Sequence, residues 1–205
     1  MRDAKIFAAL AGLGLCCSGC MTMALSREAP FQYQPPPVTR GETIPRAAGF
    51  RLLVDERPRA DHVHTKGIQD VPARIAGKLA EDFEQSRVFQ KVHYPAMEKD
   101  DFVITGTIRR FGWKLYETPL VYIPLVNLVT LTGFPLSAAC GVADIQLELR
   151  DGHTGELLGT FSASSKIVVP ANYYDRDPKW AGMELSESFR NVAAKLKNEI
   201  LAKLQ

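Results

Sequence analysis

Two stretches of the chain have the apolar spacing of an amphipathic helix. Apolar side chains recur at intervals of three and four residues from about Asp70 to Ser86, and again in a final stretch that reaches Leu204. This spacing places one apolar stripe along a helix. Asp70 is the expected N-cap of the first helix, and Pro72 falls in its first turn, where the missing N–H costs little. The stripes consist of Ile68, Val71, Ile75, Leu79 and Phe83, and of Leu185, Phe189, Val192, Ala193, Leu196 and Ile200.

Other apolar positions alternate with polar ones, as side chains do on the two faces of a strand. In one of these stretches the apolar set changes phase between Ile108 and Phe111, which predicts a β-bulge near Arg109 and Arg110. The turn at 151–155 joins the last two stretches into an antiparallel hairpin. The predicted strands are Phe50–Val54, Val88–Tyr94, Asp101–Tyr116, Ala143–Arg150 and Leu157–Val169.

The predicted elements follow the order β-α-β-β-β-β-α, which indicates the α+β class. We expect a single mixed or mainly antiparallel sheet with the two helices packed on one face. The chain of 205 residues is long enough for one domain once its ends are set aside. This domain is expected to begin near Ala47 and to occupy residues 47–205.

The amino terminus has the composition of a secretory signal. Arg2 and Lys5 form a short basic region, and the ten residues Ile6–Leu15 carry no charge. That length suits the apolar part of a signal peptide and is too short to span a bilayer. The sequence therefore predicts a signal peptide over residues 1–19.

Residues 17–20, Cys-Ser-Gly-Cys, resemble the signal of bacterial lipoproteins, in which small residues precede a cysteine that becomes acylated. The resemblance implies lipidation of Cys20, with Cys17 standing where leucine is usual. Cys16 is the alternative acylation site, and an ordinary secretory signal or an uncleaved anchor is the alternative to lipidation. Because no Asp follows Cys20, the resemblance implies the outer membrane, with the domain facing the periplasm. Each buried methylene of an acyl chain contributes about 0.8 kcal/mol, so two or three chains hold a protein firmly.

Residues 20–46 are expected to form the lipidated cysteine and a proline-rich tether. Five prolines occur within Ala24–Pro45 among scattered polar residues. Proline fixes φ and removes a hydrogen-bond donor, so this stretch should be extended and unpaired, with a reach of roughly 60 Å at about 3.1 Å per residue. The alternative is that it packs along the surface of the domain.

Charge and cysteine content narrow the possible roles. The net charge of +2 is close to neutral and gives no reason to expect nucleic acid as a partner. Of the four cysteines, only Cys140 lies beyond the leader. A lone cysteine cannot form an internal disulfide, and its apolar surroundings at 138–142 predict that it is buried.

Three segments, 102–109, 143–151 and 183–204, resemble a known group of envelope proteins. Phe-Val-Ile-Thr-Gly-Thr-Ile and Ile-Gln-Leu-Glu-Leu-Arg-Asp, with a Thr-Gly turn and a closing amphipathic helix, are similar to the amino-terminal domain of the Tol-system protein TolB. Small lipoproteins of the YajG-like group and the curli-secretion lipoprotein look similar at this level. The resemblance covers most of Phe50–Leu204 and implies a protein without catalytic residues.

The 26 residues Thr118–Ala143 contain no charged side chain and depart from the TolB pattern. Pro124 and Pro135 limit a straight helix to about 11 residues, or roughly 16 Å, too short for a hydrocarbon core of about 30 Å. We take residues 118–142 as an insertion. Three interpretations stay open: a buried core element, a surface loop or short helix that meets the membrane or a partner, and a pore-forming hairpin in an oligomer.

The second interpretation assigns a contact surface for a membrane or an envelope protein. A further loop, 173–180, is dense in aromatic and charged side chains, which suits a partner-binding rim. It equally suits a loop that pins the last helix, with Asp177 as cap and Pro178 at N1. Deletion of Leu120–Leu136 should leave a soluble fold and remove binding. The expected contact residues are Leu120, Val121, Tyr122, Ile123, Leu125, Val126, Leu128, Val129, Phe134, Tyr173, Tyr174 and Trp180.

Residues that carry chemistry are sparse. His62 and His64 lie beside Asp61 and would point the same way in an extended segment, but no third metal ligand stands at a recognisable spacing. His153, beside Asp151, is interpreted as a turn residue. The sequence has no nucleophile-elbow pattern and no phosphate loop. We therefore expect no catalytic residue, no metal and no cofactor.

The expected function is that of a non-catalytic, membrane-anchored periplasmic lipoprotein, an accessory or scaffold in an envelope assembly, secretion or transport complex. The expected partners are the membrane, through acyl chains on Cys20, and an envelope protein, with a homo-oligomer left open. One alternative is an oligomeric secretion lipoprotein whose 118–142 segment inserts in the outer membrane. The other is a hydrolase or metal-binding protein.

Overall fold

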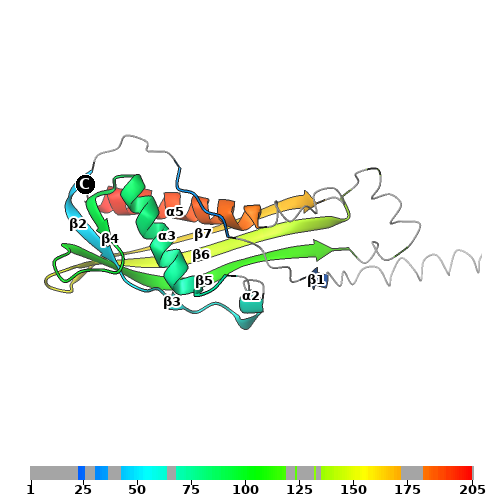
Figure 1. Ribbon diagram of the computed structural model, residues 1–205, viewed down its shortest axis with the longest axis horizontal. Helices are drawn as coiled ribbons and strands as arrows, with labels where there is room; N and C mark the ends of the chain where they lie inside the picture. Colours follow the sequence, from blue (N-terminus) through cyan, green and yellow to red (C-terminus); the bar gives the residue numbers. More distant parts are fainter. Residues whose placement is uncertain are drawn as a thin grey trace, which may run out of the picture.

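The computed structural model describes residues 23–25, 31–36, 43–63, 68–118, 123, 132, 135–171 and 182–204 (Figure 1). In these residues one sheet carries the two long helices, α3 and α5, on the same face. The elements in chain order are β1 (Met23–Leu25), β2 (Ile44–Phe50), β3 (Val54–Asp55), α2 (Arg59–Val63), α3 (Val71–Gln85), β4 (Phe89–His93), β5 (Phe102–Glu117), β6 (Ser137–Asp151), β7 (Leu157–Ala171) and α5 (Met183–Leu204).

The sheet runs in the order β4-β2-β5-β6-β7 and is mixed. Strand β2 is parallel to both β4 and β5, whereas β5, β6 and β7 are antiparallel to their neighbours. The short strands β3 and β1 pair with later stretches of the same β5 edge that β2 occupies first. The predicted α+β class, with a mixed sheet and two helices on one face, is confirmed.

The core lies between the sheet and the two helices. All six predicted stripe residues of α5 are almost fully buried, and so are Ile75, Leu79 and Phe83 of α3. Burial of each such side chain contributes about 1.5–3 kcal/mol at most. Asp70 caps α3 as predicted, because its side chain accepts a hydrogen bond from the backbone N–H of Ala73.

Strand β5 keeps one face toward the core along its whole length because of a bulge. Its register with β6 shifts between Ile108 and Arg110. As a result Ile108 before the shift and Phe111 after it are both fully buried. The predicted bulge is confirmed, and so is the antiparallel hairpin of β6 and β7.

Asp151 holds the hairpin turn, a role that is typical of aspartate between two strands. Its Oδ1 accepts hydrogen bonds from the backbone N–H groups of Thr154, at 2.8 Å, and His153, at 2.9 Å. These two bonds lower the pKa of the Asp151 carboxyl below its ordinary value. His153 is thus part of the turn, as predicted.

The predicted first strand, Phe50–Val54, is wrong in its bounds. The chain forms β2 before it, leaves the ladder at 51–53 and pairs again as β3. Leu53 is buried, but Leu52 and Val54 are exposed, so this apolar run does not form a one-sided strand. Strand β2 reads Ile-Pro-Arg-Ala-Ala-Gly-Phe, which is a poor strand sequence, and its form depends on its two parallel neighbours.

Part of the predicted tether belongs to the fold. Phe31 and Tyr33 are buried in the hydrophobic core, Pro45 lies inside β2, and Met23–Leu25 forms β1. The prolines exclude a regular strand at 31–36, but the apolar area of two aromatic rings favours docking. The interpretation of this range as extended and unpaired is therefore corrected for these residues. We call residues 31–36 the strap.

The end of the predicted insertion also belongs to the fold. Residues 137–142 form the start of β6 and pair with both β5 and β7. Ala139 and Cys140 are buried there, and the predicted burial of Cys140 is confirmed. The 118–142 boundary was drawn from the absence of charge, and buried central strands share that property with insertions.

Candidate functional site

One end of the sheet brings the amino-terminal strand together with the ends of the three long strands. Glu117, Ser137 and Ala171 are in register across β5, β6 and β7, and Met23 of β1 pairs with Glu117 (Figure 1, right). We call this the β1 end. The predicted acylation site, Cys20, stands three residues before Met23 in the sequence.

Thr118 and Leu136, which stand on either side of the predicted apolar segment (residues 119–135), meet at the β1 end. The backbone N–H and the Oγ1 of Thr118 both donate to the carbonyl of Leu136, at 3.0 and 3.1 Å. Leu136 is buried and belongs to the fold, so the predicted contact surface is limited to residues before it.

Of the predicted contact residues, the structure describes Ile123, which is 47% exposed. Its assignment as a contact residue stays a prediction. The other predicted site residues lie outside the described residues: Cys20, Leu120, Val121, Tyr122, Leu125, Val126, Leu128, Val129, Phe134, Tyr173, Tyr174 and Trp180.

The strap is held by aromatic packing that the sequence analysis missed. Phe31 packs edge-on against Phe111 and Phe189, with ring centroids 5.1 and 5.3 Å apart. Tyr33 packs edge-on against Phe189 at 4.7 Å. Arg74 of α3 adds a hydrogen bond of 3.2 Å to the carbonyl of Phe31. A signal was present in the alternation Phe31-Gln32-Tyr33, which places both rings on one side of an extended chain.

Tyr33 also ties the strap to a buried ion pair between the two long helices. Its hydroxyl donates to Oδ2 of Asp82 at 2.8 Å, and Nζ of Lys197 donates to Oδ1 of Asp82 at 2.7 Å. Lys197 donates further to Oγ of Ser86 at 2.7 Å. Burial, together with the Asp82 carboxylate, raises the pKa of Tyr33, so its hydroxyl stays protonated and keeps its donor role.

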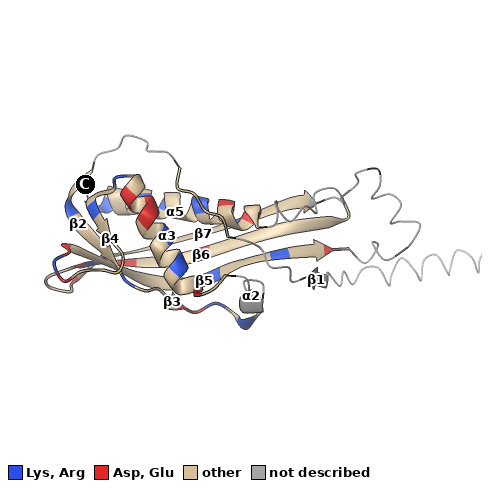
Figure 2. Cartoon of the chain, in the orientation of Figure 1, with Lys and Arg blue, Asp and Glu red and all other residues tan. Residues whose placement is uncertain are grey.

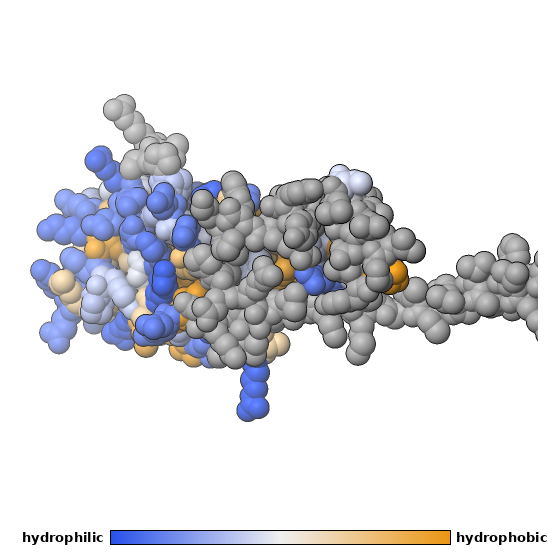
Figure 3. Space-filling view, turned by 45° about the vertical axis from the view of Figure 1, so that its right-hand side comes forward, coloured by the Kyte–Doolittle hydropathy of each residue, from blue (hydrophilic) through white to orange (hydrophobic). Residues whose placement is uncertain are grey.

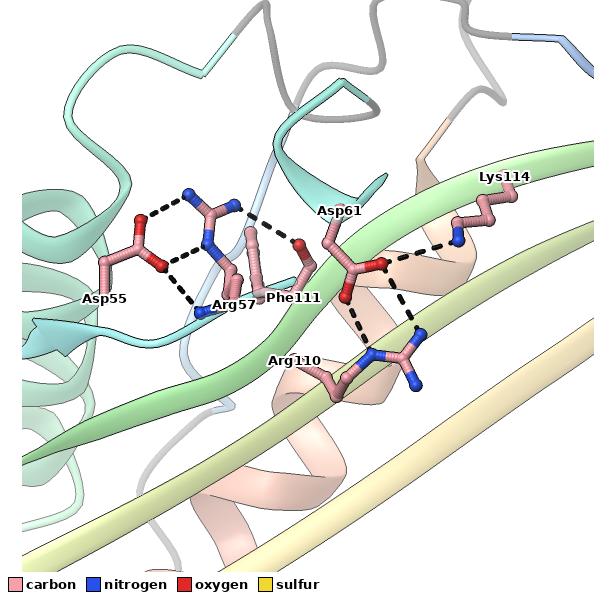
Figure 4. A network of polar contacts seen from close by, with 6 residues as sticks. All are labelled: Asp55, Arg57, Asp61, Arg110, Phe111 and Lys114. Carbon is pink, nitrogen blue, oxygen red and sulfur yellow. Dashed lines mark hydrogen bonds and ion pairs between the residues drawn. The ribbon is translucent and has the colours of Figure 1, made fainter. Parts of the chain in front are cut away.

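A second buried carboxylate, Asp61 of α2, faces the middle of β5 (Figure 4). Its Oδ2 accepts from Nε of Arg110 at 2.7 Å, and its Oδ1 lies 3.4 Å from Nζ of Lys114. Because α2 is a helix, the extended geometry proposed for His62 and His64 is wrong at His62, while His64 lies outside the described residues.

Arg57 lies next to this contact and binds two parts of the fold (Figure 4). Its Nη2 forms an ion pair of 2.7 Å with Asp55, and its Nη1 lies 3.4 Å from the carbonyl of Phe111. Together with Asp61, it covers the stretch of the β5 edge between β3 and β1. These charges stabilise an edge that is otherwise open to another strand.

A third buried carboxylate, Asp100, holds the loop after β4. Its Oδ1 lies 2.5 Å from Nδ1 of His93, and its Oδ2 accepts from the backbone N–H of Met97 at 2.7 Å. A Cβ at Gly49 would stand 2.1 Å from the same Oδ2, so only glycine allows β2 to approach this loop. The contacts of Asp100 with His93 and Met97 therefore tie this loop to the sheet.

Metal and membrane-spanning features were sought in the described part of the chain. No group of three or more His, Cys, Asp or Glu side chains is placed there to hold a metal ion. None of its helices combines the length and the apolar character needed to cross a bilayer. Cys140 is buried, and burial raises the pKa of its thiol, which disfavours the reactive thiolate.

Comparison with known proteins identifies relatives by structure only. No family model and no curated protein matches the chain. A DUF330-family protein from Xanthomonas campestris is 12% identical, with 87% of this chain and 96% of that one covered and a TM-score of 0.52. The likeness to this protein shows the fold.

Two further solved structures match at lower TM-scores. The PelC dodecamer from Paraburkholderia phytofirmans is 12% identical, covers 82% of this chain and 96% of its own, and has a TM-score of 0.41. Lipoprotein GNA1162 from Neisseria meningitidis is 16% identical, covers 62% of this chain and 87% of its own, and has a TM-score of 0.35.

Proposed function

We propose that the chain is a non-catalytic lipoprotein of the bacterial envelope, anchored by acyl chains on Cys20 in the outer membrane and facing the periplasm. It acts as an accessory or scaffold in an assembly, secretion or transport complex. Its mechanism is positional: the lipid holds the fold at the membrane, and the exposed surface of the fold binds the partner.

The observation that carries this proposal is the attachment of the amino-terminal segment to the fold. Strand β1 starts three residues after Cys20 and pairs with β5, and Phe31 and Tyr33 of the strap are buried against both long helices. A lipid on Cys20 would therefore act on a strand that pairs with the sheet three residues further along the chain. Such an arrangement suits a protein whose task is to occupy a fixed place at a membrane.

The use of the buried charges supports a role without catalysis. Asp61, Asp82 and Asp100 each accept hydrogen bonds or ion pairs that join separate elements of the fold. Buried carboxylates with such partners hold a structure together, whereas a general base must face its substrate.

Lipidation is tested by growing cells on radiolabelled palmitate and comparing the wild-type protein with Cys20→Ser. We expect label in the wild type and none in Cys20→Ser, which also remains unprocessed. Cys16→Ser is the matched control and should be labelled like the wild type. A wild-type protein without label removes the anchor on which this function depends, and label that persists in Cys20→Ser places the acyl chains on another cysteine.

The contact role of the apolar segment is tested by replacing residues 120–134 with a short Gly-Ser turn, which spares the buried Leu136. We expect a folded protein, judged by circular dichroism and thermal unfolding, that no longer captures an envelope partner from cross-linked cells. Failure to fold would place the segment in the core and end its assignment as a contact surface.

A second candidate is an oligomeric secretion lipoprotein, and strand β7 favours it. This 15-residue strand is the last in the sheet order and carries one charged residue, Lys166. A long edge with little charge is a template for a strand of another copy. Sedimentation of detergent-extracted protein should give an assembly that the exposed-edge variant Ser164→Lys dissociates. A wild-type monomer excludes this candidate.

A further inference from the structure

We propose that the β1 end of the sheet lies against the bilayer, so that the long strands stand upright and the β2–β4 end points away from the membrane. This orientation rests on the proposed lipidation of Cys20. The occupant of the β1 end is a phospholipid surface.

The chain between the proposed lipid and the fold is short. Cys20 and Met23 are three residues apart, and an extended chain spans at most about 3.6 Å per residue. The α-carbon of Cys20 therefore stays within about 11 Å of Met23. A free proline-rich tether of roughly 60 Å would have left every orientation open, whereas this connection fixes one end near the lipid.

The ends of the strands at the β1 end are in register, so they lie at the same level along the strand direction. Met23 pairs with Glu117, Glu117 with Ser137, and Ser137 with Ala171. A lipid that reaches Met23 thus brings the ends of β5, β6 and β7 to the membrane together.

The sheet also projects past α5 at this end. A Cβ at Gly141 would stand 2.2 Å from the backbone of Glu184, so the first turn of α5 rests on Gly141. Gly141 pairs with Trp113 and Ile167, and each strand continues four residues further. At about 3.3 Å per residue, the sheet extends roughly 13 Å beyond the start of the helix.

The projecting part of β7 has the chemistry of a membrane contact. Val168 and Val169 point to opposite faces of the sheet, and both are exposed. Lys166, just behind them, is exposed and positively charged. The carboxylate of Glu117 at the same end is buried. Exposed valines in front of a lysine suit contact with apolar chains below anionic headgroups.

The opposite end has a different surface. Figure 2 shows charged residues gathered around β2, β4 and the neighbouring loops, and Figure 3 shows hydrophilic side chains over the same end. Exposed charged residues there are Lys91, Glu98, Lys99 and Glu156. Burying these charges in a bilayer would be costly, so this end is suited to the aqueous side.

The orientation is tested by energy transfer from the protein to the membrane. Two single variants of the mature, lipidated protein, Val169→Cys and Leu157→Cys, are each labelled with the same fluorophore. The two sites are 43% and 46% exposed and lie in one strand, 12 residues or about 40 Å apart. The proteins are inserted in vesicles of phosphatidylethanolamine and phosphatidylglycerol with a rhodamine headgroup acceptor. Wild-type protein, whose Cys140 is buried, is the labelling control.

We expect strong transfer from position 169 and at least a twofold weaker transfer from position 157. Equal transfer from the two sites would overturn the orientation, whether both are strong, as for a domain lying flat, or both weak, as for a domain on a long tether. Val168→Cys is a second probe in case Val169→Cys does not fold.

Vesicle flotation separates this inference from the proposed function. Wild-type protein that floats with the vesicles, together with equal transfer from the two sites, leaves the lipid anchor in place and excludes the upright orientation. Wild-type protein that fails to float excludes the lipid anchor, and the orientation with it.

Discussion

The strap and the carboxy-terminal unit of β6, β7 and α5 are built in opposite ways. The unit is one continuous stretch, in which each element packs on its neighbours in the chain. The strap is six residues that dock on Arg74, Asp82, Phe111 and Phe189, each at least 43 positions away in the sequence.

The two regions therefore gain their stability at different stages of folding. A hairpin with an adjoining helix gains contacts as soon as nearby residues meet, whereas the strap docks on residues far along the chain and is ordered only after the core has formed. The Asp82–Lys197 pair joins the two regions, because it binds α3 to α5 and accepts the Tyr33 hydroxyl. We call the Asp82–Lys197 pair the joint. Substitutions can therefore affect the joint, the strap alone or the hairpin alone.

The largest effect is expected at the joint. Asp82→Ala leaves the amine of Lys197 buried without its counter-charge and removes the acceptor of Tyr33, so the free energy of unfolding should fall by about 3–5 kcal/mol in urea titration. Lys195→Met, in the exposed pair with Glu199, is the control and should change it by less than about 0.5 kcal/mol. An equal loss in the two variants would contradict a special role for the buried pair.

The second-largest loss of stability is expected for a substitution that affects the strap and spares the carboxy-terminal unit. Phe31→Ala should cost about 3 kcal/mol, at the low end for a buried phenylalanine, because the strap can swing out instead of leaving a cavity. Hydrogen exchange and limited proteolysis should show the loss at the strap while the amides of β6 and β7 stay protected. Phe161→Ala, at a buried site of β7, is the matched control and should expose the hairpin amides instead.

Tyr33→Phe removes one hydrogen bond to a charged acceptor and should cost about 1.5–3 kcal/mol near neutral pH. The raised pKa of Tyr33 also sets a pH dependence: its stabilising contribution is present below pH of about 10 and is lost as the pH rises above that value. Between pH 8 and 11 the free energy of unfolding should therefore fall more steeply with pH for the wild type than for Tyr33→Phe. Parallel curves would mean that the hydroxyl is not held as described.

The smallest effect is expected in the hairpin turn. The lowered pKa of Asp151 gives a contribution that is present above pH of about 4 and is lost as the pH falls below it. Asp151→Asn should flatten the dependence of the melting temperature on pH between 5 and 2, with little change at pH 7. A large loss at pH 7 would show that the unit depends on this turn more than the comparison implies.

Sequence reasoning succeeded where the pattern repeats locally. The stripes of α3 and α5, the alternation of β6 and the phase shift at Arg109–Arg110 each span enough residues to fix the element and its buried face. It failed at Phe50–Val54, where four apolar residues in five suggest a strand and the chain instead leaves the sheet between β2 and β3. Short runs carry too few periods to decide between strand and connection.

The site residues divide in the same way. The leader, Cys20 and the charge-free segment are features of composition, so the sequence alone supports predictions about them. The strap and the Asp82–Lys197 pair were missed, because a charged residue on an apolar stripe has no visible partner until two helices are packed together. Composition also placed 137–142 in the insertion, although these residues belong to β6.

The amino-acid sequence by itself determined the helices, the long strands, their buried faces and the α+β class, because each depends on a period of two or about 3.6 residues along the chain. It is long-range packing that makes β2 a strand, docks Phe31 and Tyr33 of the strap in the core, and brings Met23, three residues after Cys20, to one end of the sheet. These features depend on backbone pairing and aromatic contacts between residues far apart in sequence, and no local pattern records such contacts.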